Sequence, residues 1–188
     1  MADEVERAAW SFSEWCEKRR GFSVGTGYNL VRQGKLKITK IGALSFVTAA
    51  EDVLPKDEFA STTRKYLLAM VDEINGCYQF GFYDGCAVMC RRLMETLLIE
   101  VFEHLKAGDK IKADGEYIGL GDIISRARGG QHFKLQRGSA DVMEAIKLLG
   151  DTAAHSRMYI TKQPDIDDQR FKYRKVISEL LHLAGMAC

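Results

Sequence analysis

The spacing of apolar residues changes at Pro55 and divides the chain into two parts. In residues 66–78 and 86–105, apolar side chains recur every three or four positions, which is the spacing of one face of an α-helix. The same spacing predicts three further helices, over residues 120–128, 140–156 and 169–183. We therefore expect a mainly α protein in which residues 55–188 fold as an all-α bundle of about five helices.

Residues 1–54 have a different pattern, with short elements separated by glycines. An apolar face that begins at Trp10 predicts a short first helix, and Ser23 is a suitable N-cap for a second helix that ends at Gly34. Beyond that helix, alternating apolar residues on either side of Gly42 predict a β-hairpin. Two short helices followed by a hairpin form a winged helix-turn-helix, which is the fold that we expect here.

Basic residues are concentrated in one stretch of this first part. Residues 18–50 contain seven lysines and arginines and no aspartate or glutamate. The whole chain nevertheless has a net charge of only +1, so the excess is a local patch and not a general polycationic character. A basic patch on a helix and a hairpin favours binding to the phosphates of a nucleic acid.

The order of short motifs in the first part also matches a known family. The matching residues are Ser-x-x-Thr-x-Tyr-x-Leu-Val from Ser23 to Val31, Gly-Lys-Leu-Lys at 34–37, Lys-Ile-Gly at 40–42 and Thr-Ala-Ala-Glu-Asp at 48–52. They resemble the excisionase-type winged helix-turn-helix, a relative of the MerR DNA-binding domain. The resemblance implies that the partner is double-stranded DNA and that the second helix enters the major groove.

The same resemblance implies which side chains contact DNA. Ser23, Thr26 and Asn29 would read base edges from the second helix. The phosphates would be contacted by four basic residues, Arg32, Lys35, Lys37 and Lys40. Because Gly25 and Gly27 lie inside this helix and each costs about 1 kcal/mol of helix stability relative to alanine, we expect modest affinity for one module.

Two stretches of the second part match another family. They are YQFGFYDGCAVMCRRLMETLLIEVFEHL, which begins at Tyr78, and AIKLLGDTAAHS, which begins at Ala145. They resemble a HEPN-type helical bundle, in particular a bacterial group whose function is mostly unassigned. Many HEPN domains are dimeric, metal-independent ribonucleases that use an arginine and a histidine a few residues apart.

This second resemblance implies a set of catalytic candidates. His155 is the matching histidine, Asp151 stands in place of the usual asparagine, and Lys147 stands in place of the usual arginine. Lysine offers a single point charge instead of the planar fork of arginine. In the alternative interpretation, Asp151 and His155 form an internal polar clamp with Arg91 and Glu95.

Two further patterns do not indicate a site. Cys86 and Cys90 share a helix face, but no second pair completes a zinc site, so we expect core cysteines and neither a metal nor a cofactor. Arg126 and His132 have the spacing of an arginine and histidine pair, but they lie in a glycine-rich segment outside the part of the bundle in which the HEPN resemblance places that pair. We interpret that spacing as coincidence.

The chain shows no feature of an exported or membrane protein. Its five cysteines are an odd number and several lie among apolar residues, which favours reduced thiols. We find no secretory leader and no apolar run that approaches the roughly 20 residues needed to span a bilayer. We therefore expect a cytoplasmic protein without membrane partners.

Taken together, these patterns favour a DNA-binding protein, a bacterial or phage transcriptional regulator whose helical part dimerises or binds a partner. A homodimer is expected because specific binding by one small module usually needs two linked half-sites. The first alternative is a HEPN-type ribonuclease, as in a toxin or phage-defence effector. The second is a non-catalytic helical protein that binds an RNA or protein partner. Of these, a protein without enzymatic activity is the preferred prediction.

Overall fold

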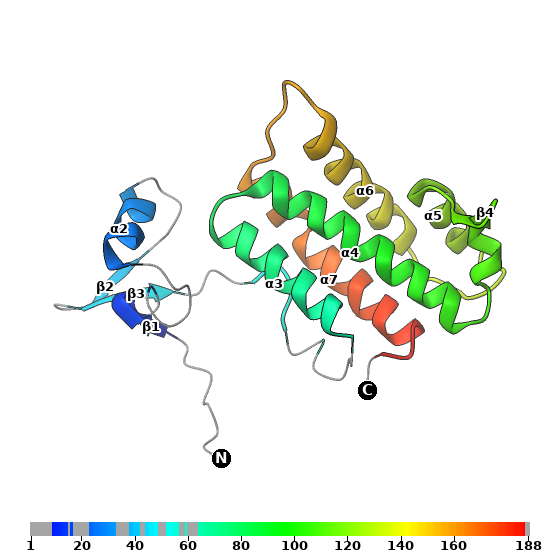
Figure 1. Ribbon diagram of the computed structural model, residues 1–188, viewed down its shortest axis with the longest axis horizontal. Helices are drawn as coiled ribbons and strands as arrows, with labels where there is room; N and C mark the ends of the chain where they lie inside the picture. Colours follow the sequence, from blue (N-terminus) through cyan, green and yellow to red (C-terminus); the bar gives the residue numbers. More distant parts are fainter. Residues whose placement is uncertain are drawn as a thin grey trace, which may run out of the picture. The chain divides into compact units, whose positions relative to one another are not determined.

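The computed structural model describes residues 9–14, 16, 23–32, 38–41, 44–48, 52–56, 59 and 64–186. The chain divides into two units, which are considered separately below (Figure 1). The first comprises Met1–Asp52 together with Gln79–Gly81, and the second comprises Val53–Tyr78 and Phe82–Cys188.

The first unit contains a small antiparallel sheet and two helices among its described residues. Its strands are β1 (Ala9–Ser11), β2 (Thr39–Ile41) and β3 (Leu44–Thr48), which lie in the order β1-β3-β2. Its helices are α1 (Phe12–Glu14) and α2 (Val24–Arg32). The predicted pairing on either side of position 42 is present, since β2 is antiparallel to β3 and Ile41 pairs with Leu44.

Strand β1 differs from the prediction. The sequence pattern places Trp10 in the first helix, whereas Trp10 lies in β1 opposite Val47, and α1 begins at Phe12. The edge of β3 supplies hydrogen-bond partners for β1 from more than 30 residues away. Local spacing of apolar residues cannot reveal such a long-range pairing.

The core of the first unit is small. Phe12 and Cys16 are buried, with 4% and 0% of their surface exposed. Val24, Val31 and Ile38 pack against them and are partly buried. The inner face of α2 is thereby fixed, because Val24 and Val31 lie two turns apart on that helix.

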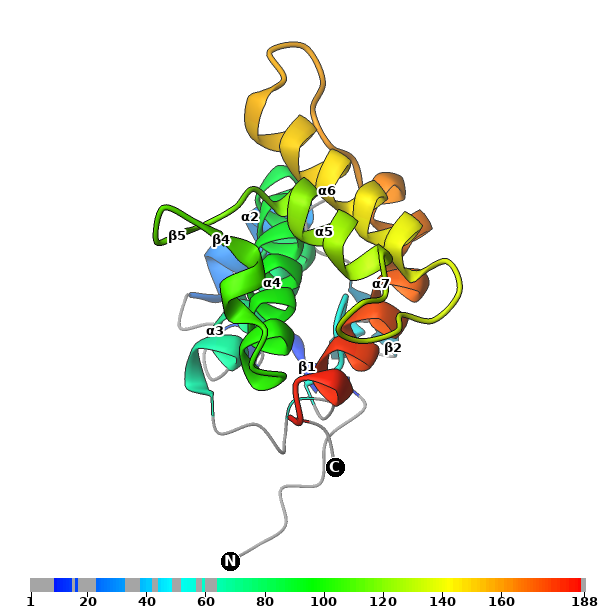
Figure 2. The same ribbon diagram turned by 90° about the vertical axis from the view of Figure 1, so that its right-hand side faces the viewer.

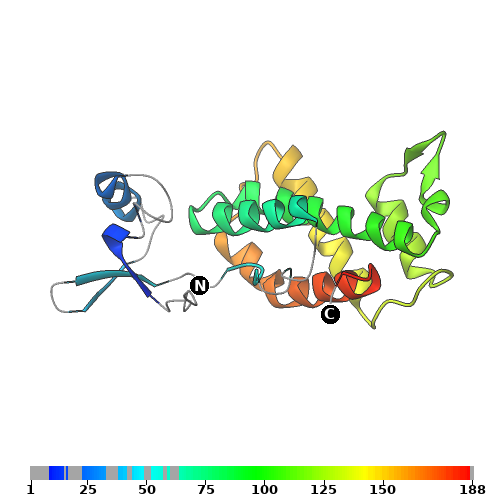
Figure 3. The same cartoon turned by 60° about the horizontal axis from the view of Figure 1, so that its bottom comes forward.

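The second unit is a helical bundle, as predicted. Among the described residues it contains α3 (Lys65–Gln79), α4 (Tyr83–His104), α5 (Leu120–Arg128), α6 (Ser139–His155) and α7 (Gln163–Leu183). Helix α4 packs against both α6 and α7, and α5 packs against α6 (Figure 2). Helices α4 and α7 run in the same direction and α6 runs in the opposite one (Figure 1). In Figure 3, α3 and α4 form one layer and α7 lies beneath it.

The bundle differs from the prediction at the start of α7 and in the connection between α4 and α5. Helix α7 begins at Gln163 instead of Gln169. Asp165 fixes this start, because its Oδ2 accepts the backbone N–H of Lys162 at 2.7 Å. Between α4 and α5 lie a 3₁₀ helix (Gly108–Ile111) and the two-residue strands β4 (Lys112–Ala113) and β5 (Glu116–Tyr117).

The segment that leads into the bundle is part of its core. Val53 and Leu54 are buried, with 1% and 0% of their surface exposed. The Asn75 side chain, 3% exposed, accepts the N–H of Leu54 at 3.0 Å and donates to the carbonyl of Leu54 at 2.8 Å. Arg174 Nε donates to the carbonyl of Val53 at 2.8 Å. Side chains thus satisfy a backbone that has no strand partner of its own.

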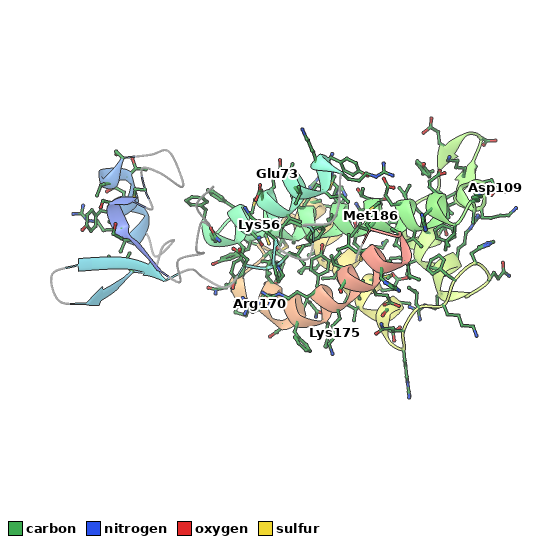
Figure 4. All side chains as sticks on the ribbon, turned by 90° about the horizontal axis from the view of Figure 1, so that it is seen from below. Lys56, Glu73, Asp109, Arg170, Lys175 and Met186 are labelled. Atoms are coloured by element: carbon green, nitrogen blue, oxygen red, sulfur yellow. The ribbon has the colours of Figure 1, made fainter. Side chains whose placement is uncertain are left out.

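Charged side chains such as Glu73, Asp109 and Lys175 project outward from the bundle (Figure 4). Lys175 Nζ lies 4.5 Å from the centroid of the Phe171 ring, which is 67% exposed. No helix in the described part of the chain has both the length and the apolar character needed to cross a membrane.

Candidate functional site

The outer face of α2 carries the residues that we expect to contact DNA. Ser23, Thr26, Asn29 and Arg32 are all exposed. Thr26, Asn29 and Arg32 follow one another three positions apart, so they lie on adjacent positions along one side of the helix. The structure thereby brings these three predicted side chains onto one solvent-facing stripe.

Ser23 has a structural role at the start of α2. The backbone N–H of Thr26 donates to Ser23 Oγ at 3.3 Å, and the two hydroxyl oxygens are 3.1 Å apart. Ser23 is therefore an N-cap that satisfies one of the free N–H groups in the first turn. A ligand that contacts the Ser23 hydroxyl would therefore also lie next to the Thr26 hydroxyl.

Gly27 explains how α2 can lie so close to its core. A Cβ atom at this buried position would collide with Cys16 Sγ and lie 2.8 Å from Phe12 Cζ. The helix-propensity cost of this glycine is thus offset by close packing. Gly25 is exposed, and among the described residues a Cβ there would lie 3.7 Å from Ser23 Oγ. The Tyr28 ring also packs on Phe12, with 4.5 Å between ring centroids.

The structure describes the four predicted phosphate contacts to different extents. Arg32 is exposed in the last turn of α2, where a cation also favours the helix dipole. Lys40 lies in β2 and pairs with Ser45 of β3. Lys35 and Lys37 lie outside the described residues.

A second polar cluster lies between α4 and α6. Asp151 Oδ1 is 2.7 Å from Arg91 Nε, and Asp151 Oδ2 accepts a hydrogen bond from Lys147 Nζ at 2.8 Å. On α4, Arg91 Nη1 is 3.3 Å from Glu95 Oε2. The four side chains are about one-third exposed and alternate in charge. We refer to Arg91, Glu95, Lys147 and Asp151 as the α4–α6 charge cluster.

The charge cluster holds Asp151 as an anion. Burial raises the pKa of this carboxyl, but the hydrogen bond from Lys147 and the charge of Arg91 together bring the pKa below its usual value. His155 is exposed at the end of α6, and within residues 64–186 no hydrogen bond joins it to Asp151. The polar clamp considered from the sequence therefore includes Lys147 in place of His155. A carboxylate already paired with two cations is a poor general base.

The sequence did not indicate how α4 and α6 come close enough to form this cluster. Gly150 is buried on α6, and a Cβ atom there would lie 2.6 Å from Arg91 Cβ and 3.1 Å from the carbonyl oxygen of Ala87. The glycine thus permits a close crossing of the two helices. A glycine in a helix interior is the signal that could have predicted it.

The remaining candidates lie apart from these two sites. Cys86 and Cys90 are buried in α4, and their hydrogen bond, together with burial, raises the pKa of the Cys86 thiol. In the part of the chain that the structure describes, no three His, Cys, Asp or Glu side chains are grouped so as to hold a metal ion. Arg126 and His132 are exposed, and the His132 ring lies 5.9 Å from the Phe102 ring.

Comparisons with protein-family models, curated proteins and solved structures found no match to this chain. Functional inference therefore rests on its own residues and their arrangement.

Proposed function

We propose that the protein binds double-stranded DNA through its first unit. The observation that carries the proposal is the two-sided character of α2. One side is fixed on Phe12 and Cys16 through Gly27, and the other exposes Thr26, Asn29 and Arg32. A short helix with a buried face and an exposed polar stripe can enter a major groove while its own unit holds it in place.

Each exposed side chain has a distinct role in this proposal. The amide of Asn29 can donate to and accept from adenine in the major groove. The Ser23 and Thr26 hydroxyls contact bases or sugars near the start of the helix. Arg32 contacts a phosphate from the last turn, and Lys40 contacts another from the hairpin. The basic residues outside the described ranges, Lys35 and Lys37, add to the same field.

We further propose a role in transcriptional regulation, which the two-unit organisation supports. A single small module buries too little surface for specific binding, whereas two modules joined through their bundles bind as one bivalent ligand. We propose that the second unit supplies this dimerisation or binds a regulatory partner.

Fluorescence anisotropy with labelled duplex DNA tests the proposal. We expect Asn29→Ala in the full chain to weaken binding by about 5- to 150-fold, which corresponds to about 1–3 kcal/mol for a paired base contact. Arg32→Ala should weaken binding to all sequences alike. The matched controls are Ser13→Ala and Arg157→Ala, which are exposed outside the stripe. Equal affinity for wild type and both stripe variants would refute the proposal.

The ribonuclease alternative depends on His155. The His155 side chain is accessible at the end of α6. The negative charge of Asp151, however, is paired with Arg91 and Lys147, and no hydrogen bond among the described residues joins Asp151 to His155. The alternative predicts RNA cleavage by wild type that His155→Ala abolishes while the helical circular dichroism is retained. Absence of RNA cleavage by wild type would exclude the ribonuclease alternative.

A further inference from the structure

A second stretch without acidic residues lies in the bundle. Residues 123–140 contain no aspartate or glutamate. The stretch includes the end of α5 and the connection to α6, and its basic side chains are all exposed. We call the following residues the basic loop: Arg126, Arg128, His132, Lys134 and Arg137.

Most cations of the basic loop have no carboxylate partner among the described residues of the bundle. Arg128 pairs with Asp141 at 3.0 Å. Within residues 64–186, no ion pair joins Arg126, Lys134 or Arg137 to an acidic side chain. The basic loop therefore presents uncompensated positive charge to solvent, which attracts polyanions.

The backbone of the basic loop is anchored to the bundle. Phe133 is buried, and its ring centroid lies 5.1 Å from that of Phe102. Glu179 of α7 accepts the backbone N–H of Gln136 and the hydroxyl of Ser139, each at 2.5 Å. Since the backbone is already fixed, its cations lose less conformational entropy on binding than those of a free tail.

The basic loop also encloses a concave surface. Arg128 and Lys134 line an open hollow with about 610 Å³ of empty space. Gly130 and Gly138, with φ of 66° and 87°, turn the chain along its edge. Of the residues that line the hollow, Asp141 is the acidic one, and its charge is paired with Arg128.

We propose that the basic loop is a second phosphate-binding surface, which contacts the backbone of duplex DNA when the first unit is bound. This inference rests on the DNA-binding function proposed above. Duplex DNA fits better than a single strand, because single strands are held by stacking on exposed aromatic rings. Residues 123–140 contain one Phe, Tyr or Trp side chain, Phe133, and it is buried. Arginine and lysine contacts to phosphate are independent of sequence.

A matched pair of double variants tests the basic loop in the full chain. The first is Lys134→Gln with Arg137→Gln. The control is Lys172→Gln with Arg157→Gln, which removes one lysine and one arginine that are equally exposed on other elements. Affinity for a long DNA duplex is measured between about 50 and about 200 mM salt, a range over which released counterions control binding.

The slope of log affinity against log salt concentration is negative. We expect the loop variant to make it shallower by about 2, because each lost phosphate contact removes about 0.9 from its magnitude. The control should keep the wild-type slope. Arg126→Gln gives a separate test on α5, with an expected decrease of about 1. Circular dichroism should show the same helical content for all variants, because each replaced side chain is exposed.

The outcomes separate this inference from the function on which it rests. If wild type binds no DNA, both fail. If Asn29→Ala weakens binding but the loop variant and Arg126→Gln keep the wild-type slope, only the basic-loop inference is overturned. The basic-loop inference is also overturned if the loop variant has a shallower slope than wild type with duplex RNA but the same slope with duplex DNA. The basic loop would then bind the phosphates of RNA and not those of DNA.

Discussion

The close crossing of α4 and α6 predicts opposite effects for the same substitution at two helical glycines. Gly150 is buried against α4, whereas a Cβ at Gly76 on α3 would meet no atom of the described residues within 4 Å beyond its own stretch of helix. Glycine to alanine in a helix interior stabilises by up to about 1 kcal/mol when the added methyl group meets nothing. Gly76→Ala should therefore raise the free energy of unfolding by about 0.5–1 kcal/mol.

Gly150→Ala should instead lower the free energy of unfolding. The new Cβ would lie 2.6 Å from Arg91 Cβ and 3.1 Å from the Ala87 carbonyl oxygen, well inside the usual carbon contact distance of about 3.5–4.0 Å. Neither atom is the flexible end of a side chain, so α4 and α6 must separate. Overpacking costs about 1–3 kcal/mol, and the gain in helix propensity recovers at most about 1 kcal/mol. We expect a net destabilisation of up to about 2 kcal/mol.

Urea unfolding of the full chain, followed by helical circular dichroism, measures both variants on the same transition. The account predicts that their midpoints move in opposite directions from wild type. If Gly150→Ala is as stable as Gly76→Ala, the two helices are not in close contact at this position. The ion pair between Arg91 and Asp151 would then need another explanation.

The remaining predictions concern Asn75 and Tyr78. Asn75→Ala leaves the buried N–H and carbonyl of Leu54 without their side-chain partners and should destabilise the bundle by about 2–4 kcal/mol in the same urea assay. The control Asn29→Ala, at an exposed position, should have no comparable effect. Equal effects of the two substitutions would contradict the role of Asn75. Burial, then the hydrogen bond to Asp167, raises the pKa of Tyr78 to about 12. Its contribution to stability is therefore complete below pH about 10, the usual pKa of tyrosine, and is lost as the pH rises toward about 12. Tyr78→Phe should make unfolding less dependent on pH in that window, and an unchanged profile would contradict the raised pKa.

The helices of the bundle could be predicted where amphipathic spacing specifies them. Helix α5 covers Leu120–Arg128, as the sequence predicts, because its buried apolar residues recur every three or four positions. The start of α7 could not be predicted in this way. Residues 163–168 are mostly polar, and the helix begins there because Asp165 and Pro164 favour a first turn. Strand β1 depends on pairing with β3 and has no local signal of its own.

The candidate sites could be predicted as sets of residues but not as contacts. The family resemblance named Thr26 and Asn29 as base contacts and Arg32 as a phosphate contact, and the structure shows all three exposed along one side of α2. The sequence grouped Arg91, Glu95 and Asp151 with His155. The structure pairs Asp151 with Lys147, one turn earlier on the same helix, and not with His155. It also pairs Asp151 with Arg91 of α4, which the close crossing at Gly150 brings within reach. Crossing distance is a tertiary property that spacing along one helix does not contain.

The most direct test of the central claim is selection of bound fragments from a pool of random duplex DNA, carried out with wild type and with Asn29→Ala. We expect wild type to enrich a defined motif. An inverted repeat in that motif would show that the protein binds as a symmetric dimer. We also expect Asn29→Ala to lose preference at one base position of that motif while retaining the others. A pool that stays random, or the same motif selected by both proteins, would contradict base recognition by the exposed face of α2.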